Sequence, residues 1–272
     1  MGSSPTLRSS VAAEATRLLP SWARRWPRVG VYDAVQGAGE TPALRCMGPE
    51  RICWGLLRRR QCLVPTLRAG LLLVSALVVL AWIAVRAAYP FLAVDVPAPG
   101  GVLVVEGWVP DSTFRAAIAE FKRNHYSRLL VSGIPLEQGT LLFAYTNYAY
   151  LGAATLLKLG MSTNEVAAVP TPETQRDRTY AMAQNIGAWL REHQISGGNI
   201  NVLTEGAHAR RSRLMYEKAL GRAYTVGVFP VPPSGYDPKH WWRSRQGVRV
   251  VTGEVIAYAY ARFLFHPPKA TE

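Results

Sequence analysis

The densest group of residues capable of chemistry lies in the stretch NINVLTEGAHARRSR, residues 199–213. Residues 199–203 have the apolar pattern of a short buried strand and a helical pattern begins at about Ala207, so Thr204 lies at the corner between them. His208 and Arg211 then fall on the first turn of a helix, where free N–H groups and the helix dipole favour an anion. We expect Thr204 and Arg211 to bind a phosphorylated or otherwise acidic ligand here, and His208 to be catalytic.

Polar residues also follow the other predicted strands. Parallel strands bring their carboxyl ends to one edge of the sheet, where the ligands of α/β proteins bind. Glu106 ends the apolar run VLVV and precedes Gly107, so we expect desolvation to raise its pKa and to suit it to general-base catalysis. The alternative is a carboxylate that caps backbone N–H groups or pairs with an arginine. Ser132, Gly133 and Glu137 are expected to bind ligand at the same edge.

A second basic cluster, ETQRDRT at residues 173–179, precedes another predicted helix. Arg178 can grip a phosphate at that helix entrance, although charged residues there are more often solvated caps. No metal site is expected, because the histidines show no HxxH or HxxxH spacing and a metal would need His208 with Glu106 or Glu205. The motifs GxGxxG, GxxxxGK[ST] and GxSxG are absent, which argues against the usual dinucleotide, P-loop and serine-hydrolase functions.

Strand and helix patterns alternate through the second half of the chain. This alternation predicts an α/β, Rossmann-like domain of three layers over residues 102–266, with a mostly parallel sheet of about five strands and right-handed crossovers. Residues 267–272 are a tail. The strands are expected at 102–105, 129–131, 166–169, 199–203 and 224–230, and the helices at 112–124, 145–159, 178–193, 207–221 and 248–265.

A membrane anchor is predicted before this domain. The run AGLLLVSALVVLAWIAV at residues 69–85 has no charge, and a segment over 69–90 is long enough to cross a bilayer. A buried core helix is the alternative, but the segment is apolar on all faces. Arginines cluster before it, so the positive-inside rule keeps the N-terminus in the cytoplasm and exports the domain. The prediction is a single-pass membrane protein whose domain lies outside the cytoplasm.

The regions that flank the anchor have little predicted structure. Residues 1–68 are basic and proline-rich and are expected to be a disordered cytoplasmic tail, and residues 91–101 are expected to be a Pro/Gly linker. Cys46, Cys53 and Cys62 all precede the anchor, which suits an exported domain without thiols. The run after Met47 is also what an anchored protein with its true start there would show. The net charge of +13 is compatible with nucleic acid, but its position beside the anchor favours a membrane and no nucleic-acid partner.

An aromatic and basic loop, KHWWRSR at residues 239–245, has three interpretations. Its two tryptophans are suited to stacking on a sugar or to resting on a lipid surface. Packing of one tryptophan against the sheet is the commoner outcome.

The order of these motifs resembles the YdcF-like family (domain of unknown function 218), which also includes SanA and ElyC. The resemblance rests on one membrane helix followed by VLVVEGW, SGIPLEQG, QRDRTYAMAQN and VLTEGAHARRSR. Thr204, His208 and Arg211 match the family pattern T-S-x-x-H-x-x-R, with Glu205 in place of its Ser. Thr179 matches the Thr of a third motif, whose following Glu and Asn are apolar residues here, and the family's L-G-G turn is replaced by Glu-Gly-Trp. Glu137 is similar to the family's acidic residue after the S-G-G turn.

The resemblance implies a Rossmann-like fold without the dinucleotide fingerprint. It also implies a protein of the bacterial inner membrane with its domain in the periplasm, linked to the envelope barrier and to peptidoglycan or surface-polysaccharide assembly. The leading hypothesis is an envelope protein that binds or processes a phosphorylated, possibly polyprenyl-linked, precursor; the alternative is a non-catalytic module for a nucleotide or S-adenosylmethionine. Neither the reaction nor a cofactor nor an oligomeric state follows from the sequence.

Overall fold

The computed structural model describes residues 51–52, 57–59, 63–136 and 144–268. The chain divides into two units, Met1–Val64 and Pro65–Glu272. Three short strands, β1 (Arg51–Ile52), β2 (Leu57–Arg59) and β3 (Leu63–Pro65), form a sheet in which β1 and β2 are antiparallel. Most of residues 1–68, predicted to be a disordered or poorly structured tail, therefore lies outside the described residues, and residues 51–52, 57–59 and 63–65 form these short strands.

Helix α2 (Leu67–Leu92) contains the predicted anchor and extends beyond it at both ends. Thr66 caps it, with Oγ1 accepting a hydrogen bond from the Ala69 backbone N–H at 3.3 Å. Leu92 is its one buried residue among those described, and no part of its most apolar stretch is buried. The alternative of a buried core helix is therefore wrong. By length and composition α2 is the one described helix able to cross a membrane.

A five-stranded sheet forms the centre of the second unit. Its strands are β4 (Gly101–Glu106), β5 (Tyr126–Gly133), β6 (Val166–Pro170), β7 (Gly198–Glu205) and β8 (Tyr224–Val231). The order is β6-β5-β4-β7-β8 and every neighbouring pair is parallel, so the predicted α/β class with a five-stranded sheet is confirmed. Strand β4 is central, with Val104 paired to Leu130 on one side and Val202 on the other.

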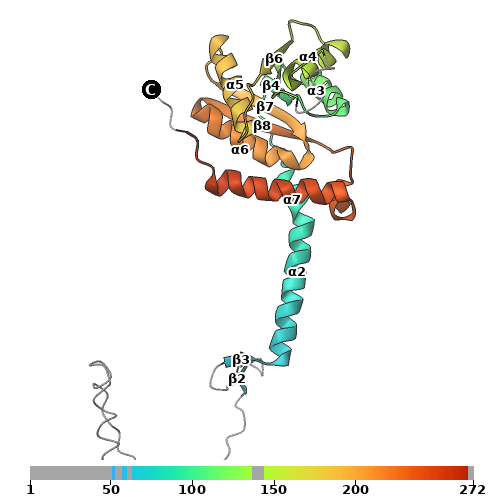
Figure 1. Cartoon of the computed structure of the whole chain (residues 1–272), viewed down its shortest axis with the longest axis vertical. Coiled ribbons are helices and arrows are strands. Elements are labelled where there is room, and N and C mark those ends of the chain that lie inside the picture. Colours follow the sequence, from blue (N-terminus) through green and yellow to red (C-terminus); the bar gives the residue numbers. More distant parts are fainter. Residues whose placement is uncertain (1–50, 53–56, 60–62, 137–143, 269–272) are drawn as a thin grey trace, which may run out of the picture. The chain divides into compact units, whose positions relative to one another are not determined.

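Two pairs of helices cover the sheet (Figure 1). On one face α5 (Arg178–Glu192) and α6 (Ala209–Leu220) pack Ile186, Leu190 and Tyr216 against the strands. On the other, α3 (Asp111–Arg123) and α4 (Tyr148–Lys158) contribute Phe114 and Leu156. The predicted three layers are thus present. The chain ends with α7 (Arg245–Ala259) and one π turn, η5 (Tyr260–Leu264), and short 3₁₀ turns occur at η2 (Gly206–His208), η3 (Gly221–Ala223) and η4 (Pro238–Arg243).

The segment predicted as a linker is held by the domain along much of its length. Phe91 and Leu92 belong to α2, and Val96 forms an antiparallel bridge with Val228 of β8. Asn201 of β7 accepts a hydrogen bond from the Ala98 backbone N–H and donates to the carbonyl oxygens of Ala98 and Gly100. The segment predicted as a Pro/Gly linker is thus fixed to the domain, because a buried amide on the sheet satisfies backbone groups at Ala98 and Gly100.

Candidate functional site at the carboxyl edge of the sheet

The candidate site is built on the ends of the two central strands. Glu106 is the last residue of β4 and is fully buried. Strand β7 ends at Glu205, and the chain then turns through η2 into α6, which places His208 at the N-cap of that helix. Register brings Thr204 beside the end of β4, because Val105 pairs with Leu203. The predicted meeting of these strand ends is confirmed.

Glu106 is surrounded by hydrogen-bond donors. Thr204 donates its hydroxyl to Oε2, and the Ser212 hydroxyl donates to Oε1 over 2.9 Å. Burial opposes its charge, but the positive charge of His208 and these hydrogen bonds outweigh burial and hold the pKa of Glu106 below its usual value. The predicted raised pKa is therefore wrong. A carboxylate with this environment remains ionised at neutral pH, which suits an electrostatic partner of His208 better than a base.

The imidazole of His208 lies between two carboxylates. Its Nδ1 donates to Glu254 Oε1 over 2.8 Å, and its Nε2 lies 3.5 Å from Glu106 Oε2. Burial opposes the charged ring, but Glu106 and then Glu254 outweigh this opposition and raise the pKa of His208 to about 9. The ring therefore carries a positive charge at neutral pH. Its Nε2 is buried and makes no hydrogen bond with any described residue.

Helix α7 supplies the second carboxylate. Arg211 Nε donates to Glu254 Oε2 over 2.8 Å and Nη2 donates to Oε1 over 3.0 Å, a bidentate pair. Nη2 also lies 2.9 Å from His208 Nδ1, but a protonated ring has no lone pair there, so Glu254 is the acceptor for both cations. Arg211 Nη1 donates to Thr179 Oγ1 over 3.1 Å, which joins α5 to the cluster.

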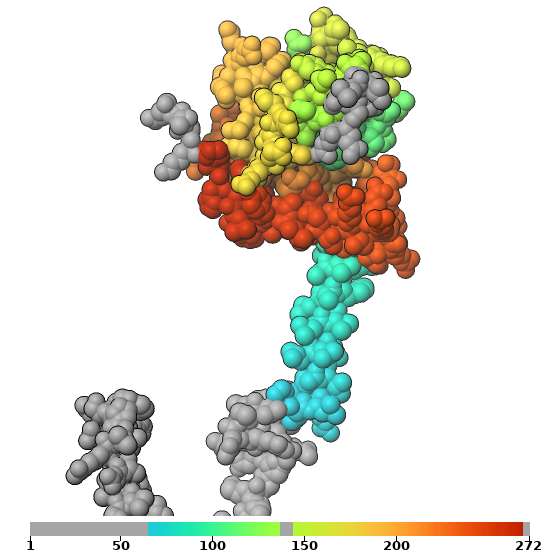
Figure 2. All heavy atoms as spheres, in the orientation of Figure 1, coloured from blue at the N-terminus to red at the C-terminus, as the bar shows by residue number. Residues whose placement is uncertain are grey.

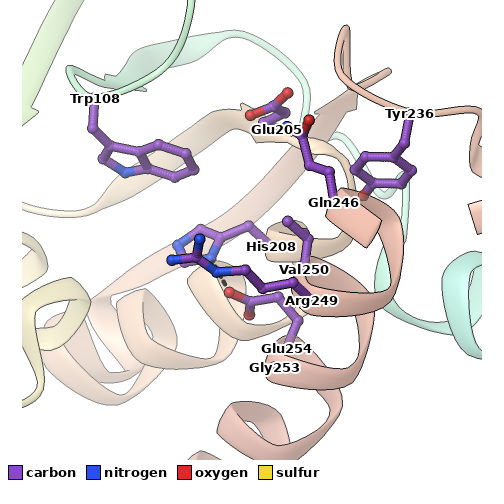
Figure 3. A pocket seen from close by; sticks show the side chains of 9 residues that line it. All are labelled: Trp108, Glu205, His208, Tyr236, Gln246, Arg249, Val250, Gly253 and Glu254. Carbon is purple, nitrogen blue, oxygen red and sulfur yellow. Dashed lines mark hydrogen bonds and ion pairs between the residues drawn. The ribbon is translucent and has the colours of Figure 1, made fainter. Parts of the chain in front are cut away.

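Two hollows open beside this cluster, and His208 and Trp108 line both of them. The larger, of about 500 Å³, also has Arg178, Thr179 and Arg211 in its wall. The smaller, of about 250 Å³, is bounded by residues of α7 and by Glu205; Figure 3 shows Trp108 facing His208 and Glu254 across it. The Trp108 and His208 rings meet edge to face, with centroids 5.2 Å apart. The imidazole is thus the buried cation on the wall between two spaces.

The structure separates the remaining predicted ligand residues. Ser132 is fully buried, with its hydroxyl accepting a hydrogen bond from Tyr216 over 3.2 Å. Gly133 is covered by α4, since a Cβ there would lie 2.2 Å from the Ala149 backbone N. Both residues lie at the end of β5 and line neither of the two hollows described above. Glu137 lies outside the described residues.

Several residues of the site were not predicted from the sequence. Glu254 was missed because it lies on the last helix, which follows the strands in the sequence. The available signal was that it is the one acidic residue of this helix, three positions after buried Val251. Ser212 and Trp108 were also missed. Arg249, which lines the smaller hollow, forms no ion pair with a residue in the described part of the chain.

The tryptophans of residues 239–245 pack against α2 rather than on the sheet. Trp241 is buried with Leu92, Ala207 and Val251, and its Nε1 donates to the Val85 carbonyl over 3.1 Å. Across the described residues, no group of three or more His, Cys, Asp or Glu residues is arranged to hold a metal ion.

The fold and the site together define an α/β protein of the Rossmann-like class, with a histidine-centred cluster of charges at the carboxyl edge of its sheet. No protein-family description, curated protein or solved structure matches the chain. The resemblance to the YdcF-like family therefore stays a prediction.

Proposed function

We propose that this chain is a YdcF-like, membrane-anchored protein of the bacterial cell envelope that binds or processes a phosphorylated precursor of peptidoglycan or surface polysaccharide. A polyprenyl-linked intermediate is the ligand that the combination of an apolar anchor and an anion site favours. The anchor is α2, with the N-terminus in the cytoplasm and the α/β domain in the periplasm.

The observation that carries the proposal is the charged imidazole of His208. Its Nε2–H is buried and has only a long ion-pair contact, 3.5 Å to Glu106 Oε2, and the ring borders two hollows. A buried N–H without a short hydrogen bond is costly, and an anionic oxygen of a ligand would give it a shorter, charge-assisted hydrogen bond than the contact with Glu106. A protonated histidine in this position is also able to donate its proton to a leaving group.

The other residues take different parts from those expected. Arg211 is engaged bidentately by Glu254, so its charge is offset and it positions His208 and Thr179 more than it attracts a ligand. Arg178 in the larger hollow and Arg249 in the smaller one remain at the walls, where they add positive charge for a phosphate. Glu106, at the end of β4, keeps the imidazole charged from its Nε2 side.

Binding to the full chain in detergent tests the proposal. Polyprenyl phosphates are expected to raise the apparent melting temperature, because a ligand that binds the folded state alone stabilises it. His208→Gln should abolish that rise, while the matched exposed variant His125→Gln should keep it. A rise with nucleotides or S-adenosylmethionine and none with polyprenyl phosphates would instead establish the alternative, a binding module for adenosyl ligands.

Activity in cells gives the second test. A deletion strain carrying His208→Gln at normal abundance should fail to recover envelope resistance. Full recovery with this variant would contradict a role for the site.

A further inference from the structure

The outer face of the C-terminal helix carries large apolar side chains in contact with solvent. Ile256 is 71% exposed, and Phe263 and Leu264 in the following π turn are 74% and 70% exposed. Helix α7 crosses the end of the domain at which α2 joins it (Figure 1), and its surface is open there (Figure 2). Exposed apolar residues gathered on one element indicate a contact surface.

The two faces of α7 differ in character. Val251 and Ala261 are buried and Glu254 reaches the site, so one face packs on the domain. The opposite face, spaced by three or four residues, is exposed along its whole length and consists of Arg245, Arg249, Thr252, Ile256, Ala259 and Phe263. We call these residues the α7 outer face. Arginines occupy its first half and apolar side chains its second half, so this one face offers both basic groups for lipid headgroups and apolar groups for acyl chains.

The position of the α7 outer face is set by its junction with α2. The Arg86 guanidinium lies 5.3 Å from the ring centroid of Trp82 and 5.3 Å from that of Trp242. Phe91 meets Tyr258 of α7 edge to face, with centroids 5.5 Å apart. Tryptophan, tyrosine and arginine are the residues that mark the ends of membrane-spanning helices. The apolar part of α2 thus stops where α7 crosses it.

Charge on this segment also favours lipid. Residues 238–265 contain five Lys and Arg residues against one acidic residue, Glu254, which is occupied by His208 and Arg211. Basic residues near a bilayer are attracted to anionic headgroups. A second copy of the chain would bring the same positive charges together, so it suits this surface less well.

We propose that the α7 outer face rests on the headgroup region of an anionic bilayer, with Ile256, Phe263 and the adjacent Leu264 inserted at the boundary of the acyl chains. This inference rests on the proposed membrane anchor. It also bears on the ligand of the site: Arg249, at the margin of the α7 outer face, has its side chain in the wall of the smaller hollow (Figure 3), so a ligand whose phosphate is attached to a lipid suits that hollow.

Depth-dependent fluorescence quenching tests the inference on the full chain in vesicles of phosphatidylcholine and phosphatidylglycerol with doxyl-labelled lipid. Environment-sensitive probes are placed singly at Phe263→Cys, at Val78→Cys in α2 and at Lys158→Cys at the end of α4, with Cys46, Cys53 and Cys62 changed to Ser. The Phe263→Cys probe is expected to be quenched several-fold more than the Lys158→Cys probe, because Lys158 belongs to α4 and α4 lies on the side of the domain away from α2 in Figure 1.

The three positions distinguish the ways of failing. Quenching at Val78→Cys with none at Phe263→Cys would overturn the contact of α7 and leave the anchor standing. Absence of quenching at Val78→Cys would overturn the anchor and this inference with it. Shielding of the Phe263→Cys probe that rises with protein concentration in detergent, with no lipid quenching, would assign the surface to a second copy of the chain and overturn the inference.

Discussion

His208 is held from two sides that the chain builds in different ways. On one side Glu106 is fixed by the hydrogen bonds of a central strand, has no exposure and receives two hydroxyl hydrogen bonds. On the other, Glu254 is carried by α7, keeps 15% side-chain exposure and binds two cations. The position of Glu106 is fixed by the sheet itself, whereas the position of Glu254 depends on how α7 packs against the domain. The two carboxylates should therefore respond differently to mutation.

Removal of the strand-side carboxylate should have the largest effect. Glu106→Ala leaves the His208 charge buried without its lower partner and the Thr204 and Ser212 hydroxyls without an acceptor. We expect the free energy of unfolding to fall by about 3–5 kcal/mol, as for other broken buried pairs. Denaturant unfolding of the full chain in detergent measures this loss. The surface variant Glu217→Ala is the control, and an equal loss in both variants would contradict a stabilising role of the buried Glu106 carboxylate.

The next largest effect is on pH dependence. The pKa of His208 is raised from its ordinary value of about 6.5 to about 9. The charged ring therefore contributes fully to the free energy of unfolding below pH 6.5, and this contribution is lost as the pH rises through 9. By linkage the full loss is on the order of 3 kcal/mol. Unfolding measured from neutral to alkaline pH should show the decline in the native chain and a shallower one in His208→Gln. The same decline in His208→Gln as in the native chain would show that His208 does not cause the loss of stability at alkaline pH.

Removal of the helix-side charge should act mainly on the titration of His208. Glu254→Gln keeps the shape and a hydrogen-bond acceptor for Nδ1 but leaves Arg211 to repel the ring. The pKa of His208 should then fall by about one unit or more. Titration of the histidine proton resonances by NMR detects the change, with Glu217→Gln as the matched control. An unchanged pKa would mean that Glu106 alone sets the charge of the ring.

The smallest effect concerns the docking of α7 beside α2. Trp241→Phe keeps an aromatic ring but removes the donor to the Val85 carbonyl. A loss of about 1 kcal/mol in unfolding free energy is expected. Trp189→Phe is the comparison, because that side chain lies on α5, away from the junction. A larger loss for Trp189→Phe would contradict the prediction that the Trp241 hydrogen bond to α2 stabilises the fold more than an ordinary tryptophan contact does.

The strand side could be predicted from the sequence because its signals are local. Apolar runs that end in a polar residue and a glycine mark the ends of β4 and β5, and parallel pairing then brings Glu106, Thr204 and His208 to one edge. Helix boundaries followed from the same patterns: α5 was expected at 178–193 and is found at Arg178–Glu192.

The helix side could not be predicted because its position depends on tertiary packing. Nothing near Glu254 in the sequence indicates that α7 returns across the sheet edge. The pKa of Glu106 was predicted in the wrong direction for the same reason, since burial alone raises it and the opposing His208 charge requires the ring to be placed. Gly133 was expected to bind ligand from its place at a strand end, yet the approach of α4 covers it.

The segment after α2 is held against the sheet, which limits how far the α/β domain can move relative to α2. Because Asn201 binds the backbone at Ala98 and Gly100, and Val96 pairs with Val228, the domain is not tethered by a loose chain. With α2 in a bilayer, the two hollows would stay at one height above the lipid and in one orientation. If the proposed function is correct, this fixed height would favour lipid-linked ligands whose phosphate lies at the level of His208 over ligands whose charge lies farther from the bilayer.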